Sequence, residues 1–423
     1  MFAPPLVDAT GAPAEPAHAY VELLTAVPPR LLTYAALLLT VGVAVWRLWI
    51  YPRVGVAVAS DAAAFGRARR RVAFMGVLGA IGGLVAAGWL LAVQLGALDG
   101  AGDSMLGALV AHTRWGRFWS VQAAAFAVAG LAFWAAHRAD AGTDVGEVAT
   151  RAYVVAGAAA GVAAAAQAGL GHAAADEAFP RLALVAAGAH VLGAATWLGT
   201  LAVLAIAWLA LAPPEPDPVD VLIAPAVART PAATARLAPT PLPTPRTLAD
   251  VAYGHVAEVY AAEVHTSAVV TTTLSGRAGR SAASEFGQSD LPRRLPPAAL
   301  VAPQVAVFSR VALVAAAITV AAGTSNAWMR LAGASPDAGA ADRLAALTTS
   351  PYGWLLVAKL ALVVVVAAVG AVNWRRHTPR LAEPDGRGGM ATLDGATRVE
   401  LGVAAAVLVL SAALALTSPP GTE

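Results

Sequence analysis

The sequence contains no cysteine and few charged side chains. Without Cys the chain has no disulfide, no thiolate metal site, no iron–sulfur cluster and no catalytic thiol. Charged residues make up 13% of the 423 residues and hydrophobic residues 58%, whereas a soluble globule carries roughly 25% charged residues. Lysine is almost absent, since the cationic residues are 27 Arg and Lys359. The composition therefore argues against a water-soluble protein, and the net charge of +2 is too small to favour nucleic-acid binding.

Long apolar runs account for most of the chain. A membrane-spanning helix needs about 20 mostly apolar residues, and continuous runs favour helices over the short alternating segments of a β-barrel. Eight runs meet this length: 31–50, 72–95, 115–136, 151–172, 182–211, 304–329, 353–374 and 398–417. The sequence therefore predicts an all-α fold, a polytopic membrane helix bundle with about eight transmembrane helices that lies in the lipid bilayer.

Arginine is distributed unevenly between the two ends of this predicted bundle. Thirteen Arg flank the runs at one end: Arg47, Arg53, Arg67, Arg69, Arg70, Arg71, Arg138, Arg151, Arg375, Arg376, Arg380, Arg387 and Arg398. Five lie at the other end: Arg30, Arg114, Arg181, Arg330 and Arg343. Because short cytoplasmic loops carry the excess of positive charge, the first end is expected to be cytoplasmic and both termini to lie outside.

Two segments differ from the short connections between runs. Residues 1–30 are rich in Pro and Ala and lack the basic start of a secretory signal peptide, so we expect a short, poorly ordered outer tail. Residues 212–303 hold 14 of the 28 prolines, which favours a flexible cytoplasmic insertion with one candidate helix at 247–274. The insertion separates five helices within 31–211 from three within 304–420, all in one bundle.

Two histidines lie in the outer half of the predicted bundle. His172 ends the fourth run, and His190 lies about eight residues into the fifth, which is about 12 Å at 1.5 Å per residue. A neutral imidazole is a common copper ligand, so the pair is a candidate metal site, although each His is equally compatible with a hydrogen-bonded packing role. Met329, near the outer end of the sixth run, is either a soft ligand suited to Cu(I) or a packing residue.

Other polar residues within the runs are candidate supporting groups. Lys359 lies in the outer half of the seventh run, where its ammonium either repels cations, pairs with a carboxylate, gates a pathway or snorkels to the headgroups. Asn326 lies near the outer end of the sixth run, and Trp197 follows the second histidine on one helix face. Arg310 and Glu400 both fall near the inner boundary, which predicts an ion pair between the sixth and eighth helices.

Three functions are compatible with these residues. The sequence has no P-loop and no soluble nucleotide domain, so any transport is expected to be passive or ion-coupled. The first function is such transport of a metal ion that imidazole and thioether groups bind, and we do not expect an enzyme. The second is a membrane redox protein in which the two histidines ligate haem iron axially. The third is an assembly factor that delivers copper to an oxidase without transporting it. The same histidines serve all three functions.

The order of residues in the second half of the chain resembles a known family. The segment HVLGAATWLGTL, which begins at His190, is similar to a helix signature of the copper resistance protein D (CopD) family. The segments 323–327, 352–360, 371–374 and 398–401 follow in the order of that family. The resemblance covers roughly 31–211 and 304–420, and it is strongest over the last four helices.

The resemblance implies a multi-pass protein of the plasma (inner) membrane that handles copper, commonly taken to move copper towards the cytoplasm with a periplasmic CopC-like copper donor as partner. The family pattern matches His172, His190, Trp197, Arg310, Asn326, Tyr352, Lys359, Asn373 and Glu400. Two features depart from it. The insertion at 212–303 is long, and the outer tail is too short for a fused CopC-like domain, so the donor is expected to be a separate protein. We therefore predict a membrane copper transport or copper resistance protein that takes copper from the outer face through a site in the outer half of the bundle.

Overall fold

The computed structural model describes residues 16–55, 62–97, 105–140, 147–171, 180–211, 297–331, 339–382, 387–418 and 420. Within these ranges the chain is helical and contains no strand. Eight helical segments are long and apolar enough to cross a membrane: Thr25–Val54, Ala64–Gly96, Arg114–Ala139, Glu147–Leu170, Pro180–Trp208, Leu300–Arg330, Pro351–Arg376 and Thr392–Leu414. They confirm the predicted all-α membrane bundle.

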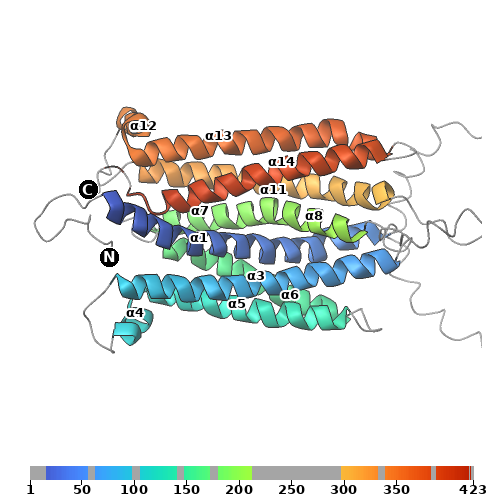
Figure 1. The fold of residues 1–423 in the computed structure, drawn as a ribbon, viewed down its shortest axis with the longest axis horizontal. Helices are drawn as coiled ribbons and strands as arrows, with labels where there is room; N and C mark the ends of the chain where they lie inside the picture. Colours follow the sequence, from blue (N-terminus) through green and yellow to red (C-terminus); the bar gives the residue numbers. More distant parts are fainter. Residues whose placement is uncertain are drawn as a thin grey trace, which may run out of the picture. The chain divides into compact units, whose positions relative to one another are not determined.

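Figure 1 shows the bundle as long helices packed side by side. The helices that form the eight spans are α1 (Pro16–Val45), α3 (Ala62–Gly96), α5 (Arg114–Ala139), α6 (Glu147–Gln167), α7 (Pro180–Ala194) with α8 (Thr200–Leu211), α11 (Pro297–Arg330), α13 (Pro351–Val372) and α14 (Arg387–Leu414). Two short helices, α4 (Met105–His112) and α12 (Ala340–Thr349), pack against α5 and α13. Because single helices satisfy their own backbone hydrogen bonds, this is the arrangement expected of a chain in lipid.

Helix α1 lies at the centre of the bundle, in contact with α3, α6, α8 and α14. Helix α7 packs along α11, and α13 packs along α14 at the edge of the bundle (Figure 1). The indole Nε1 of Trp46 donates a hydrogen bond of 3.1 Å to the Oε1 of Gln304, and both side chains are fully buried. Since an unpaired polar group inside an apolar bundle is costly, this bond contributes to holding the first span against the sixth.

The two ends of the bundle are distinguished by their arginines. We call the end at which α1, α5 and α8 finish the arginine end, and the end at which α7 begins and α11 finishes the histidine end. Exposed Trp side chains lie near each end: Trp49, Trp134 and Trp374 near the arginine end and Trp89, Trp328 and Trp354 near the histidine end, with 43% to 61% of each residue exposed. Exposed Trp at two levels is typical of the two membrane–water interfaces.

Three spans contain a π-helical turn, at Trp46–Ile50, Ala195–Gly199 and Asn373–His377. A π turn inserts one extra residue and shifts the face of the helix beyond it, and such turns occur frequently at functional sites. At the second turn the backbone of α1 touches the bulge, since a Cβ on Gly42 would lie 2.3 Å from the carbonyl carbon of Gly199. Only glycine fits this crossing, which brings α1 directly against the turn between α7 and α8.

The ends of two predicted segments need correction. Helix α1 begins at Pro16, so residues 16–30 of the expected outer tail are helical, and Ala26 and Pro29 are buried in the bundle. Helix α11 begins at Pro297 and passes through Pro303, so the last residues of the expected insertion are its first turns. In both cases apolar packing continues beyond the run that hydropathy detects. The rest of the insertion, including the candidate helix at 247–274, lies outside the described residues.

Candidate functional site

His190 is held in a fixed orientation between α7 and α11. Its Nδ1 lies 2.8 Å from the backbone carbonyl oxygen of Thr319. A carbonyl can only accept, so Nδ1 carries the proton and donates it, and Nε2 has a free lone pair. Nε2 makes no hydrogen bond with any residue that the structure describes. Metal-binding histidines are typically oriented in this way, by a hydrogen bond from the other ring nitrogen to a carbonyl or carboxylate.

Two glycines allow α7 and α11 to approach closely around this imidazole. A Cβ on Gly323 would lie 2.8 Å from Nδ1 and 2.9 Å from Cε1 of His190. A Cβ on Gly193, one turn further along α7, would lie 2.5 Å from the Oγ1 of Thr319. Larger residues at either position would separate the helices, so the position of the imidazole depends on glycine on both of them.

The helix face that meets His190 carries further polar residues. Thr319, Gly323, Asn326 and Arg330 are spaced by four, three and four residues, so they form one stripe along α11. Met329 lies six residues after Gly323, about 120° away around the helix axis at 3.6 residues per turn. Asn326 therefore lies on the stripe that faces His190, whereas Met329 is displaced from that stripe.

Two cationic groups, Lys359 and Arg330, lie in the half of the bundle nearer the histidine end. The charge of Lys359, on α13, acts on the imidazole of His190, and Arg330 in turn acts on Lys359. The charge of Arg330 also acts on the hydroxyl of Tyr352 at the start of α13. Lys359 itself makes no hydrogen bond or ion pair with any residue in the described ranges. The candidate imidazole thus lies within the field of a positive charge carried by another span.

The second predicted ligand, His172, lies outside the described residues, one position beyond Gly171 at the end of the fourth span. In the part of the chain that the structure describes, no three His, Cys, Asp or Glu side chains come together as a metal site would require. Trp197 is buried in the apolar core with neighbours such as Leu201 and Val305, about two turns beyond His190. Its position fits a packing role rather than contact with the imidazole.

The predicted ion pair between Arg310 and Glu400 is not formed within the described structure. Glu400 is 3% exposed, and its Oε2 accepts a hydrogen bond of 3.1 Å from the Nδ2 of Asn373, on the neighbouring span. Arg310 is exposed on α11. The prediction assumed that two charges at equal depth share a helix interface, but depth does not determine the direction in which a side chain points. Glu400 therefore links α14 to α13 and not to α11.

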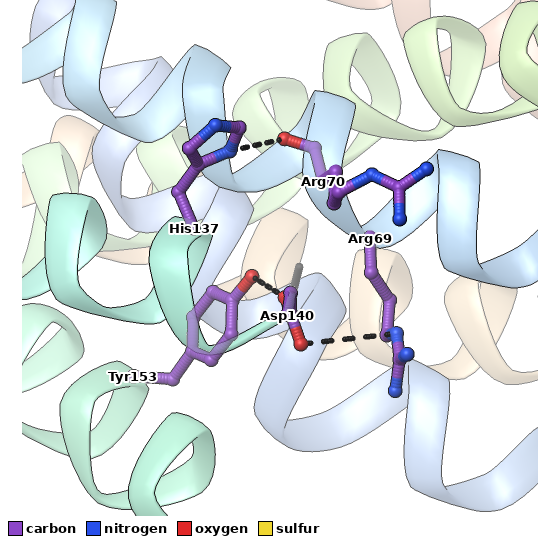
Figure 2. A network of polar contacts seen from close by, with 5 residues as sticks. All are labelled: Arg69, Arg70, His137, Asp140 and Tyr153. Carbon is purple, nitrogen blue, oxygen red and sulfur yellow. Dashed lines mark hydrogen bonds and ion pairs between the residues drawn. The ribbon is translucent and has the colours of Figure 1, made fainter. Parts of the chain in front are cut away.

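Sequence reasoning missed a second polar cluster, at the arginine end (Figure 2). The hydroxyl of Tyr153 donates a hydrogen bond of 2.9 Å to Oδ2 of Asp140, and the Nε of Arg69 lies 3.8 Å from Oδ1 of the same carboxylate. The guanidinium of Arg47 lies over the rings of Tyr51 and Tyr153, at 4.8 Å and 5.0 Å. We call Arg47, Tyr51, Arg69, Asp140 and Tyr153 the arginine cluster; of these, Figure 2 shows Arg69, Asp140 and Tyr153. The sequence does contain an indication of this cluster, because Arg47 lies inside the apolar run WRLWI. We used this arginine only to predict the orientation of the bundle.

Two sequence families match the chain. The family described as Copper resistance protein D matches residues 302–414, and the one described as Copper resistance protein D-like, N-terminal domain matches residues 22–182. Together they take in all eight spans except the fifth. Neither the comparison with curated proteins nor that with solved structures gives a match.

Proposed function

Because the chain belongs to the copper resistance protein D family, a group of membrane proteins of copper resistance or transport, we propose that it carries copper across the bilayer and that His190 is the central ligand on the way. The observation that supports this proposal is the hydrogen bond from Nδ1 to the carbonyl of Thr319, which leaves Nε2 free. An imidazole fixed in this tautomer binds a metal without a prior rotation of the ring.

In this proposal the histidine end faces the outside, as the arginine distribution indicates, and the membrane is the plasma (inner) membrane. Copper arrives from the outer face, delivered by a separate CopC-like protein. His172, at the outer end of the fourth span, is the second ligand. Met329 is the soft thioether that meets Cu(I) near the end of α11, before it reaches the histidine. Asn326 lines the same stripe and hydrogen-bonds the ligands or water around the ion.

Lys359 is the group that keeps copper binding weak. A transported ion must bind tightly enough to be taken up and weakly enough to leave. The ammonium of Lys359 acts on His190, so it also repels a cation held at Nε2, and this repulsion shortens the time for which copper stays bound. Lys359 is thus a gating residue in this scheme and not a ligand.

Glu400 is the corresponding group near the arginine end. Its carboxylate is buried with the neutral amide of Asn373 as its hydrogen-bond partner, and ionisable groups inside a membrane span usually mark an ion pathway. Because Arg310 is exposed and makes no ion pair with Glu400, the carboxylate of Glu400 has no permanent positive partner there. The carboxylate is therefore available to attract the departing cation. Trp197 contributes by holding the π turn between α7 and α8 in the core.

The experiment that tests this function is the metal and haem content of the detergent-purified protein, by elemental analysis and visible absorption. Copper close to one ion per chain, lost in both His190→Ala and His172→Ala, would support the proposed site. His112→Ala is the matched control, because this His is exposed on α4 and is expected to leave copper unchanged. Uptake of copper by vesicles containing the same variants then distinguishes transport from delivery to an oxidase.

Two outcomes would contradict the proposal. A Soret band that disappears with His190→Ala would identify haem as the ligand of this imidazole. Copper that is retained in His190→Ala would place the ion elsewhere in the molecule.

A further inference from the structure

The arginine cluster contains more positive than negative charge. Among the described residues it brings together two guanidinium groups and one carboxylate, that of Asp140, which is completely buried. Both guanidinium groups lie over the same ring, since Arg47 is 4.8 Å and Arg69 is 5.7 Å from the centroid of Tyr51. Two like charges on one ring, inside a helix bundle, repel each other unless an anion lies between them.

Arg47 lacks the partner that a buried arginine normally has. The residue is 7% exposed, and its buried Nε has no hydrogen-bond partner. In the described ranges Arg47 makes no hydrogen bond and no ion pair, only the contacts with the rings of Tyr51 and Tyr153. Leaving a buried charge unpaired is strongly unfavourable, so the aromatic contacts alone do not account for its position.

The carboxylate of Asp140 does not neutralise both arginines. Its Oδ2 accepts from Tyr153, and its Oδ1 lies 3.8 Å from the Nε of Arg69, too far for a hydrogen bond. Oδ1 and the Nε of Arg69 are both buried without a hydrogen-bond partner. Figure 2 shows the side chain of Arg69 extending past Asp140, with only its Nε directed at the carboxylate. The cluster therefore has one uncompensated positive charge and several unused donors.

We propose that the arginine cluster binds a phosphate-type oxyanion between Arg47 and Arg69. Arginine presents planar, paired donors that match phosphate oxygens. A singly charged phosphate, such as the phosphodiester of a phospholipid or monobasic inorganic phosphate, balances the excess charge of the cluster. The site is at the level of the exposed Trp49, on which Arg53 stacks at 4.0 Å, and this is the level at which headgroups lie. The proposal does not depend on the copper function.

The test is stabilisation of the full-length protein by two probes. Purified protein in a neutral detergent is titrated with dioleoyl phosphatidylglycerol in one series and with inorganic phosphate, at ionic strength held constant with chloride, in another. We expect a saturable rise of the thermal unfolding midpoint. A rise with the lipid alone identifies a headgroup as the source, and a rise with phosphate identifies the free ion.

Two variants assign the binding to the cluster. Arg47→Gln is expected to raise the half-saturating concentration of the probe about tenfold. A loss of affinity of this size corresponds to one charge-assisted hydrogen bond. Arg53→Gln is the matched control, since it removes one exposed arginine at the same end and is expected to bind like the parent. If Arg47→Gln does not fold, Arg69→Gln replaces it. Absence of a saturable rise with either probe in the unmutated protein, or an equal response of Arg47→Gln and Arg53→Gln, would overturn the proposal.

Discussion

The histidine end and the arginine end of the bundle are organised by different forces. At the histidine end, helices α7 and α11 meet through glycines, and one imidazole is oriented by a single backbone carbonyl. Lys359 does not stabilise the packing of this end through polar contacts, since it makes no hydrogen bond or ion pair with the described residues. At the arginine end, charged side chains from the π turn after α1, from α3 and from the end of α5 meet with Tyr153 of α6. Shape determines the first site, and charge determines the second.

This difference fits the tasks that we propose for the two ends. A site for a mobile ion needs a ligand that is fixed in space but not saturated by protein partners. A site that anchors helices at the membrane surface needs many mutually dependent contacts. We therefore expect that loss of charge destabilises the arginine end, and that added side-chain volume impairs copper binding at the histidine end.

The largest effect is expected from Asp140→Asn. The substitution leaves Arg47 and Arg69 without the only carboxylate that the described structure places beside them. Breaking a buried pair by removing one partner costs about 3–5 kcal/mol, so the free energy of unfolding should fall by about that amount. Chemical denaturation in detergent micelles, followed by circular dichroism, measures the change.

The matched control for this variant is Asp394→Asn. Asp394 pairs with Arg398 at 2.8 Å, but the two side chains are 53% and 75% exposed. A pair in this environment is worth about 0–1 kcal/mol. Equal effects of the two substitutions would show that Asp140 is not a buried counter-ion, and the view that charge organises this end would be wrong.

Gly323→Ala is expected to have a smaller effect on stability and a large effect on the affinity for copper. The added Cβ would lie 2.8 Å from the Nδ1 of His190, so either the ring or the helix must move. Overpacking of this kind costs about 1–3 kcal/mol, and disturbing the group that orients a ligand weakens metal binding about tenfold to a hundredfold. Isothermal titration with copper measures the second effect.

Gly161→Ala provides the comparison, because a Cβ at Gly161 meets nothing within 4 Å. It is expected to change neither the stability nor the copper affinity by a measurable amount. If Gly323→Ala binds copper as tightly as Gly161→Ala does, the close contact of α11 with His190 has no bearing on metal binding.

The sequence predicts the eight spans well because the bilayer imposes a simple requirement on each of them. Length and hydropathy alone define a helix that must satisfy its own backbone in lipid. Hydropathy does not mark where a helix continues beyond the apolar run, which is why α1 begins at Pro16 and α11 at Pro297. It also gives no sign of the π turns, because these depend on packing such as that between Gly42 and Gly199.

The candidate site is only partly predictable for a related reason. The polar residues inside spans, such as His190 and Glu400, stand out because they are rare there. Their partners do not stand out, since the partner of His190 is a backbone carbonyl and that of Glu400 is Asn373. The sequence gives the depth of a residue but not its direction, so the pairing of Glu400 with Arg310 was wrong. Direction is determined by helix rotation, which is a property of the packed bundle.

The smallest effect on stability, and the most specific one, is expected from Lys359→Met. Lys359 makes no hydrogen bond or ion pair with the residues that the structure describes, so removing its charge breaks no contact and should not lower the free energy of unfolding. The same substitution removes a cation whose field acts on His190. Copper should therefore bind about tenfold more tightly, while uptake into vesicles slows because the ion leaves less readily.

Arg343→Gln separates this local repulsion from the general charge of the histidine end. Arg343 belongs to α12; its guanidinium lies 4.7 Å from the ring centroid of Trp328 and donates a hydrogen bond of 3.0 Å to the backbone carbonyl of the same residue. The variant therefore removes one cation at the same end and one contact with Trp328, which is not part of the stripe that faces His190. It should leave copper affinity and uptake unchanged. Weaker copper binding in Lys359→Met would mean that the ammonium supports the ligand rather than repelling the ion. A large loss of stability in the same variant would mean that charge also holds the histidine end together, and the distinction between the two ends would then fail.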